Sequence, residues 1–365
     1  MNTGIKKFDN WLEDSGPAAM VIREHMMPVE GHDGVLFPAT FAASKDKTTF
    51  KGGYNIDSFP DGSNVCLVDS VGSQANRIEP IFMRAPYDSL VPQIVVKAGV
   101  KKVNLLEAGH RAGDAIVRCS ALQESTLESA FRAVMEGNAL PLAKISPTSL
   151  VFGVWDSRKT QAKLPRLIDS KIRAYNVREL TRSATYAPPV NYTTEKLLQE
   201  PEDLLDAEGK VKSEHPFSVR GFANALATAT HGGVIATGGI RRDATLHLAA
   251  LRLLAAEDDV RTASLRRYIL GLALTAFTLP PSGYLRQGCN LVLDPDKPRE
   301  FKVIFNDGRR EDASVTHDEA LTYATAATLA FGIGESRVVD FEPELAKKDL
   351  IKNDSAEKKP KKKKE

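Results

Sequence analysis

Residues 64–82, NVCLVDSVGSQANRIEPIF, join an apolar run to a segment with helical periodicity. The run Asn64–Val68 is short and rich in valine and leucine, which predicts a buried strand. A helix is expected to follow from about Ser70 to Phe82, before Pro86. The stretch therefore predicts a buried strand that leads directly into a helix.

The helix predicted in this stretch has one apolar and one polar face. At about 100° per residue, Val71, Ala75, Ile78 and Phe82 cluster on one arc, which suits the core. The other arc carries short polar side chains and one arginine, flanked by an asparagine: Ser70, Ser73, Gln74, Asn76 and Arg77.

The composition of this polar face favours no single interpretation. Solvated helix faces usually carry Glu and Lys, whereas Gly72 alone costs about 1 kcal/mol against alanine. Short donors at a helix N-terminus, with an arginine one turn later, suit a phosphate group. From the residues alone, a phosphate-binding face and an ordinary polar surface remain equally open.

The composition is that of a globular protein. Apolar residues make up 42% of 365 residues and charged residues 26%, which allows one elaborated domain or two. No apolar stretch is long enough for a membrane span, and Met1–Asp9 lacks the apolar core of a signal peptide. We therefore expect a cytoplasmic protein without a membrane partner.

The positive charge is concentrated at the C-terminus. The chain has a net charge of +2, but residues 347–365 hold nine lysines and four acids, a net of +5. The remainder is therefore 2 − 5 = −3, so nucleic-acid binding has to rest on local patches. The lysine-rich segment 347–365 is predicted to be disordered.

Cysteines and histidines give no sign of a metal or cofactor site. Cys66, Cys119 and Cys289 are far apart and odd in number, which favours reduced, mostly buried thiols. The histidines lack the spacing of metal ligands. We expect no metal, no cofactor and no catalytic residue.

Other segments predict an α+β chain whose strands and helices do not alternate strictly. Residues 195–214 hold seven acids and three lysines, which predicts a surface insertion. A capping pattern at Thr316 predicts a final helix. Strands are expected at 149–155, 170–182, 232–240, 287–293 and 300–305, and helices at 125–137, 244–256 and 263–278.

A second basic segment spans residues 158–182, with eight Lys or Arg against two acids. In a strand, Lys171, Arg173 and Tyr175 would share one face and could contact phosphates and bases. The alternative is a charged edge strand that resists aggregation. Arg178 and Arg182 extend the basic segment as further candidate contacts.

Two further features are weaker candidates for binding. Glycine pairs allow the backbone to approach a ligand closely, but a bulged or tightly packed strand uses them equally well. Arg111 follows His110 and is a possible RNA contact. The glycine-rich candidates are Gly232, Gly233, Gly238 and Gly239, followed by Arg241 and Arg242.

The segment Ser73-Gln-x-x-Arg77 after a strand resembles the Ser-Gln-x-x-Lys/Arg helix of the Cas-seven family, the backbone subunits of type I CRISPR effector complexes. The chain is most similar to the type I-U (also I-G) RAMP branch, the Csb-one family. The similar strings occur in family order, at residues 67–80, 109–118, 178–188, 239–252 and 285–289.

This resemblance implies an RRM-like (ferredoxin-like) palm with strand-rich finger and thumb insertions. Residues 1–346 would form this single domain, with insertions near 84–118 and 156–230. The chain would bind guide crRNA through the polar helix face and assemble along it with copies of itself. Implied partners are target DNA, the large subunit and the subunit that processes or caps the guide.

Two other functions remain as alternatives. Some related backbone subunits cut RNA with a loop aspartate, so a metal-dependent ribonuclease would use Asp33 or Asp46. A metabolic enzyme has no support from a nucleophile elbow, catalytic triad or nucleotide-binding loop.

Overall fold

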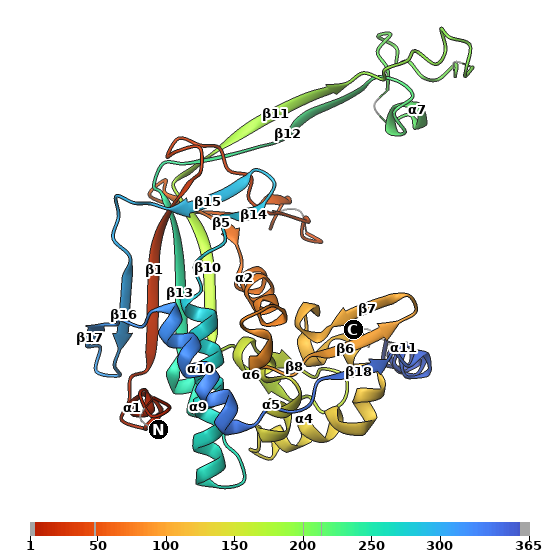
Figure 1. The fold of residues 1–365 in the computed structure, drawn as a ribbon. Helices are drawn as coiled ribbons and strands as arrows, with labels where there is room; N and C mark the ends of the chain where they lie inside the picture. Colours follow the sequence, from red (N-terminus) through yellow and green to blue (C-terminus); the bar gives the residue numbers. More distant parts are fainter. Residues whose placement is uncertain (1–3, 47–48, 200, 213, 358–365) are drawn as a thin grey trace, which may run out of the picture.

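The computed structural model describes residues 4–46, 49–199, 201–212 and 214–357. A curled antiparallel sheet forms the centre, helices cover one face of it, and a two-stranded arm projects from one end (Figure 1). The predicted α+β class is confirmed.

The main sheet has nine strands, and every pair in it is antiparallel. Along the main path the order is β14-β15-β1-β13-β10-β5-β4, and β16 also pairs with β1. The strands are β1 (Ala19–Pro28), β4 (Ile56–Ser58), β5 (Asn64–Asp69), β10 (Ile168–Tyr175), β13 (Ile240–His247), β14 (Tyr284–Arg286), β15 (Cys289–Leu293), β16 (Glu300–Ile304) and β17 (Arg310–Asp312).

The three long central strands alternate strictly between buried and half-exposed residues. Successive side chains of a strand point to opposite faces, so one face carries residues such as Ile22, Leu246 and Ile168 into the core. The other face holds mostly polar side chains and is called the open face below.

Helix α9 (Asp259–Thr278) forms the middle of the core, and α10 (His317–Phe331) packs against it. The predicted buried helix at 263–278 is confirmed. Gly271 allows the close approach, because a Cβ there would lie 2.8 Å from Ala324 Cα. Thr316 and Glu319 form the predicted capping box of α10.

The junction at residues 64–82 folds largely as expected. Strand β5 leads into α2 (Val71–Ile78), capped by Ser70, and the predicted strand and helix are confirmed. The last turn is a 3-10 helix, η1 (Glu79–Met83). Pro80 lacks an N–H group and cannot continue the α-helical hydrogen bonds, which explains the change.

Between α2 and β10 the chain forms a second lobe of short elements. Its three-stranded sheet comprises β6 (Ile94–Ala98) and β7 (Lys101–Asn104) from this part of the chain. The third strand, β18 (Arg337–Asp340), comes from the C-terminal part and pairs with β6. A small hairpin pairs β8 (Val154–Trp155) with β9 (Lys163–Leu164). The helices are η2 (Asp88–Leu90), η3 (Leu105–Glu107), η4 (Arg111–Gly113), α3 (Ala115–Arg118), η5 (Gln123–Leu127), α4 (Glu128–Met135), α5 (Leu140–Ile145) and α6 (Pro147–Phe152).

The arm consists of β11 (Val177–Tyr186) and β12 (Ala225–Ala236), which extend away from the body (Figure 1). Its tip holds α7 (Pro216–Val219) and the loops of the predicted 195–214 insertion. At its base, Asn64 Nδ2 donates to Val177 O (2.9 Å) and Asn64 Oδ1 accepts from Val177 N (2.7 Å). One amide side chain therefore fastens the first residue of the arm to β5.

Several predicted elements are wrong. Residues 149–155 form the end of α6 and then β8, because Gly153 (φ +80°) breaks the run. In the predicted strand 232–240, residues 232–236 are in a strand, but a turn at Thr237 and Gly238 separates them from the next strand, which begins at Ile240. The helix expected at 244–256 is instead the end of β13 (Ile240–His247), the single turn α8 (Leu248–Leu251) and an irregular segment.

Helix and domain boundaries also differ from expectation. Ser125 does not cap a helix, since the helical segment begins at Ala121 and the Ser125 hydroxyl donates to Ala121 O (2.9 Å). Strand β10 belongs to the main sheet, so the projecting insertion begins at about Val177 rather than 156. The predicted strand at 170–182 is two strands separated by Asn176 (φ +48°).

The two ends of the chain pack against the body through short helices. At the N-terminus, α1 (Asp9–Leu12) pairs Asp9 with Arg267 of α9. At the C-terminus, α11 (Pro343–Glu357) pairs Asp349 with Arg118. Residues 347–357, predicted to be disordered, are therefore helical, and residues 358–365 lie outside the described part. A two-stranded sheet of β2 (Thr40–Phe41) and β3 (Gly53–Tyr54) completes the structure.

Candidate nucleic-acid interface

Asp69, the last residue of β5, organises the start of α2. Its side chain is almost fully buried and accepts hydrogen bonds from Gln74 Nε2 (2.6 Å), Arg77 Nε (3.2 Å) and Arg286 Nη2 (2.7 Å). One carboxylate thus holds two arginines, which leaves a net positive charge beside the helix N-terminus.

The predicted polar face of α2 divides into a buried and an exposed part. Gln74 is buried, and its Oε1 accepts from Ser170 Oγ (3.1 Å) on β10, so it anchors the helix to the sheet. Ser70 caps the helix, and its Oγ lies 3.1 Å from Ser73 Oγ. Asn76 and Arg77 are exposed. Of the predicted contacts on this helix, these two are the most accessible.

A pocket of about 500 Å³ lies between α2 and the end of α9. We call it the proline pocket. Its lining includes Arg77, Arg84 and Arg242 together with Pro280 and Pro281. Three arginines therefore border one cavity beside the predicted helix.

Arg242 forms the buried end of this pocket and is only 3% exposed. It sits opposite Glu24 in the β1–β13 register, and its Nε donates to Glu24 Oε2 (2.5 Å). Arg299 Nε lies 2.8 Å from the other oxygen of Glu24. Among the residues that the structure describes, the buried Nη2 of Arg242 has no hydrogen-bond partner, which is unusual for a buried polar group.

On the other side of α2 lies a larger pocket of about 610 Å³. We call it the tryptophan pocket. Basic side chains and one exposed indole dominate it: Trp155, Arg111, Arg118, Arg158, Lys163 and Arg166.

Arg111 borders the tryptophan pocket but is bonded to the protein on every side. Its Nε lies 2.6 Å from Glu79 Oε2, its Nη1 donates to Gly153 O (3.3 Å), and its Nη2 donates to Asn76 Oδ1 (3.3 Å). Burial raises the pKa of Glu79 to about 7, against the opposing effect of the Arg111 cation. Arg111 is 3% exposed, so its position suits a structural ion pair better than an RNA contact.

The basic side chains of the predicted strand, now β10, point to the open face of the sheet, opposite to the face that α2 packs against. Lys171, Arg173 and Tyr175 share the open face, as expected from the alternation. Lys171 pairs with Asp169, and Arg241 binds Asp243 and the Tyr175 hydroxyl. The edge-strand interpretation is wrong, because β10 lies between β13 and β5.

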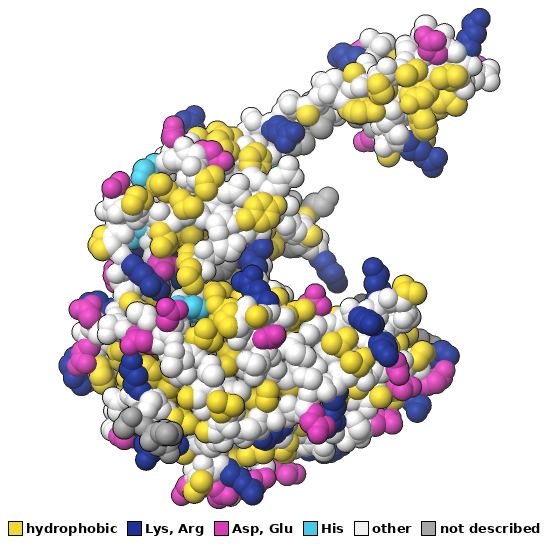
Figure 2. Space-filling view, viewed as in Figure 1, with side chains coloured by type: hydrophobic (Ala, Val, Ile, Leu, Met, Phe, Trp, Pro, Cys, Tyr) yellow, Lys and Arg dark blue, Asp and Glu magenta, His cyan; other side chains and the backbone are white. Residues whose placement is uncertain are grey.

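The predicted candidates therefore do not form one site. The α2 group and the open-face group are separated by the sheet, and Arg178 and Arg182 are exposed on the arm strand β11. Figure 2 shows a hollow between the arm and the body, with several Lys and Arg side chains at its edge on the body side.

The glycine-rich strand is explained largely by packing within the protein. A Cβ at Gly232 would lie 2.7 Å from Leu180 O, and one at Gly238 would lie 2.8 Å from Tyr175 O. Gly233 (φ +96°) is crowded by Val35 and Leu36, and Gly239 (φ +82°) closes the turn into β13. These contacts favour the bulged, tightly packed strand that was the alternative interpretation.

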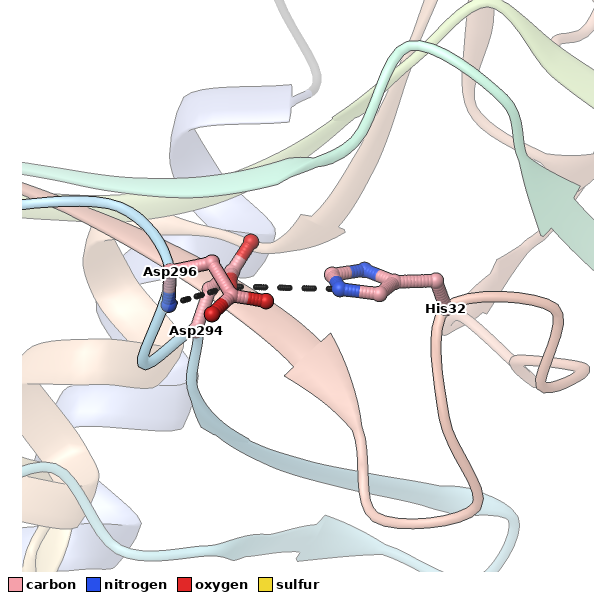
Figure 3. Close-up of side chains that lie close together, drawn as sticks. All are labelled: His32, Asp294 and Asp296. Carbon is pink, nitrogen blue, oxygen red and sulfur yellow. Dashed lines mark hydrogen bonds and ion pairs between the residues drawn. The ribbon is translucent and has the colours of Figure 1, made fainter.

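Among the side chains that the structure describes, one group could hold a metal ion. His32, Asp294 and Asp296 place one ligand atom each within 4.8 Å of one another (Figure 3). However, Lys297 Nζ lies 3.5 Å from Asp294, which is the only buried member. Within the described residues, neither Asp33 nor Asp46 belongs to the group. The sequence did not indicate it, because its members are distant along the chain.

The sequence predictions missed several residues at these pockets. Arg286 and Asp69 lie within the similar strings, but a buried carboxylate holding two arginines is visible only in three dimensions. Trp155 was expected in a strand at 149–155 with no functional role, and it is 54% exposed. Arg84 and Arg166 carried no pattern beyond their charge.

The fold and surface define an α+β protein with a hollow between its arm and its body (Figure 2). Residues 20–179 match the model of a family described as CRISPR-associated protein GSU0053. The match places this part of the chain, from β1 to the start of the arm, in a CRISPR-associated protein family and indicates a role in CRISPR defence. No curated protein matches the chain. Among the described helices, none is long and apolar enough to cross a membrane.

Proposed function

We propose that this chain is a non-enzymatic backbone subunit of the Cas-seven type in a type I-U/I-G CRISPR effector complex. It binds the backbone of guide crRNA, assembles in several copies along it with the other effector subunits, and leaves the bases free to pair with target DNA. The order of elements supports an RRM-like palm. In the sheet, the strand order is β16-β1-β13-β10. Along the chain, α2 lies between β1 and β10, and α9 lies between β13 and β16, which is the β-α-β-β-α-β order of a ferredoxin-like fold.

The proline pocket carries this proposal. Arginine binds phosphate through two parallel N–H groups, and Arg77, Arg84 and Arg242 line one cavity beside α2. Arg242 adds a buried donor without a described partner. Such a site recognises phosphate and carries no base-specific contact, which suits a guide whose bases must stay available.

The arm supports an extended assembly. Strands β11 and β12 bear Arg178 and Arg182 and continue the central strands beyond the body. An RNA strand held at α2 would pass through the hollow below this arm (Figure 2). We assign the arm as the thumb.

The test is to express the protein with and without guide RNA and to measure its size and its 260/280 nm absorbance ratio. The wild type is expected to elute with RNA as a multimer. Arg77→Glu places a carboxylate in the proline pocket and should abolish most of this association. Arg309→Glu is the matched control, because it makes the same change beside β17 on the other edge of the sheet. Unchanged RNA content and size for Arg77→Glu would contradict the proposed site.

The group His32, Asp294 and Asp296 is the one observation that favours a metal-dependent ribonuclease instead (Figure 3). Asp33 follows His32 directly, whereas Asp46 is distant from this group along the chain. Incubating the RNA-loaded protein with complementary RNA and Mg²⁺ separates the two functions. Cleavage at regular intervals that Asp33→Asn abolishes would establish the ribonuclease, and intact RNA supports the scaffold.

A further inference from the structure

We propose that the tryptophan pocket holds one unpaired base of the bound RNA, stacked on Trp155, with the adjoining phosphate on Lys163 and Arg166. This inference rests on the proposed function and adds a nucleotide-binding subsite to it. The subsite is separate from the proline pocket, on the other side of α2.

Trp155 is presented to solvent by a well-fixed hairpin. Its neighbours Val154 and Asp156 are buried, and Asp156 Oδ2 accepts from Thr160 N (2.8 Å) and Thr160 Oγ1 (2.7 Å). Trp155 itself is 54% exposed. A large aromatic side chain held open on a rigid hairpin is suited to stacking, because little conformational freedom is lost when a base packs on it.

The charges around the indole favour an anion with an aromatic group. Lys163 pairs directly with Trp155 across the hairpin, and its Nζ lies 5.5 Å from the ring centroid. Arg166 is exposed at the same rim. The pocket volume of about 610 Å³ lies within the roughly 300–1,000 Å³ typical of small-ligand sites.

The pocket is continuous with the proposed RNA path along α2. A Cβ at Gly72, in the first turn of α2, would lie 3.9 Å from Arg166 Nη2. Asn76, in the next turn, accepts a hydrogen bond from Arg111 at the base of the pocket. A strand that follows α2 therefore reaches Arg166 and Trp155 without crossing the sheet.

An RNA base fits these residues better than an acidic protein segment does. An acidic segment would use Lys163 and Arg166 but would leave the exposed indole face without a stacking partner. Base-to-aromatic stacking tolerates any sequence, because each base has a π-face, so one such pocket in each copy suits a guide of variable sequence.

The chain contains two tryptophans, which makes a direct optical test possible. Trp11 stacks on Phe8 at 4.5 Å between ring centroids, and Trp11→Phe preserves an aromatic pair there. In this background all tryptophan fluorescence comes from Trp155. The probes are a single-stranded RNA oligonucleotide and an abasic strand of the same length.

The RNA is expected to quench Trp155 fluorescence, and the abasic strand to bind without comparable quenching. Trp155→Ala should weaken RNA binding about 5- to 150-fold, corresponding to about 1–3 kcal/mol for one stacked base. Binding of the abasic strand should change little, and Trp155→Phe should retain most of the affinity. Circular dichroism and the thermal midpoint check that each variant is folded.

The outcomes separate this inference from the proposed function. RNA binding with unchanged Trp155 fluorescence and equal affinity for Trp155→Ala overturns the subsite and leaves the scaffold function standing. Failure of every folded variant to bind RNA overturns both. Quenching by concentrated protein alone, but not by RNA, overturns the subsite in favour of a contact between copies of the chain.

Discussion

The two pockets beside α2 each contain a buried arginine paired with a buried glutamate, yet the two arginines differ. Arg111, at the tryptophan pocket, donates hydrogen bonds through Nη1 and Nη2, and its Nε lies 2.6 Å from Glu79 Oε2 in an ion pair. Arg242, at the proline pocket, keeps a buried Nη2 with no partner among the described residues. In the proposed function, the first arginine serves the fold, whereas the second also donates to the bound phosphate.

This difference shows why a basic motif is an incomplete guide to a binding site. A buried ion pair loses hydration when it forms, so removing one partner is costly even when the pair itself stabilises little. Whether such an arginine also binds a ligand depends on the N–H groups that the protein leaves unpaired. Which N–H groups are paired depends on residues from distant parts of the chain.

The largest expected effect is the loss of stability in Arg111→Met. This change leaves Glu79 buried without its cation, which should lower the free energy of unfolding by about 3–5 kcal/mol at pH 8. The folded-state pKa of Glu79 is raised to about 7 from 4.5. Protonation therefore stabilises the folded state, and this contribution is lost as the pH rises from 4.5 through 7. Urea unfolding at pH 5 should consequently show a smaller penalty than at pH 8, and an equal loss at both would contradict this role.

The second effect concerns Arg242→Lys, which keeps a cation for Glu24 but removes the unpartnered Nη2. RNA affinity should fall about tenfold or more, since a hydrogen bond to a charged group contributes about 1.5–3 kcal/mol. Arg299→Lys is the matched control, because Arg299 contacts the same carboxylate but does not line the proline pocket. Equal RNA affinity for the two variants, measured by filter binding, would remove Arg242 from the site.

The third effect compares the two faces of the sheet. Arg84→Gln, at the proline pocket, should reduce the slope of log affinity against log salt concentration by about 0.7, the value for one phosphate contact on a single strand. Arg173→Gln, on the open face, should leave the slope unchanged. Equal losses would mean that the RNA also contacts the open face.

The smallest effect is expected at the thiols behind the proline pocket. Burial raises the pKa of Cys66 to about 12 and of Cys289 to about 11, so both remain protonated and inaccessible at pH 8. Iodoacetamide should leave the native protein almost unlabelled and modify all three cysteines in urea, as followed by mass spectrometry. Rapid labelling of Cys289 without urea would show that the sheet opens there.

Local patterns predicted the elements whose signals lie within one segment. The β5–α2 junction, the buried helix α9 and the capping box of α10 each follow from contiguous residues. The prediction of buried, unpaired cysteines is also confirmed. The strand prediction at 149–155 was wrong, because an apolar run of that length suits a strand and a buried helix equally well.

The candidate site was only partly predictable, since it depends on which face each cation occupies. Helical periodicity of about 100° per residue places Gln74 on the same face as Arg77. Only the fold shows that Gln74 faces Ser170 and is buried. Alternation grouped Lys171 with Arg173 correctly, but it could not place that face opposite α2. The Glu79 and Glu24 partners come from segments that no local pattern relates to Arg111 and Arg242.

The two hydrogen bonds between the Asn64 side chain and the Val177 backbone, at the base of the arm, have a geometric consequence. Strand β11 has ten residues, which corresponds to a lever of about 33 Å. A rotation of about 5° at Val177 would therefore move the far end by roughly 3 Å, close to the rise of one residue in a strand. If the tip meets a neighbouring copy in the proposed assembly, that displacement would recur at each step, so one amide side chain would help to set the pitch of that assembly.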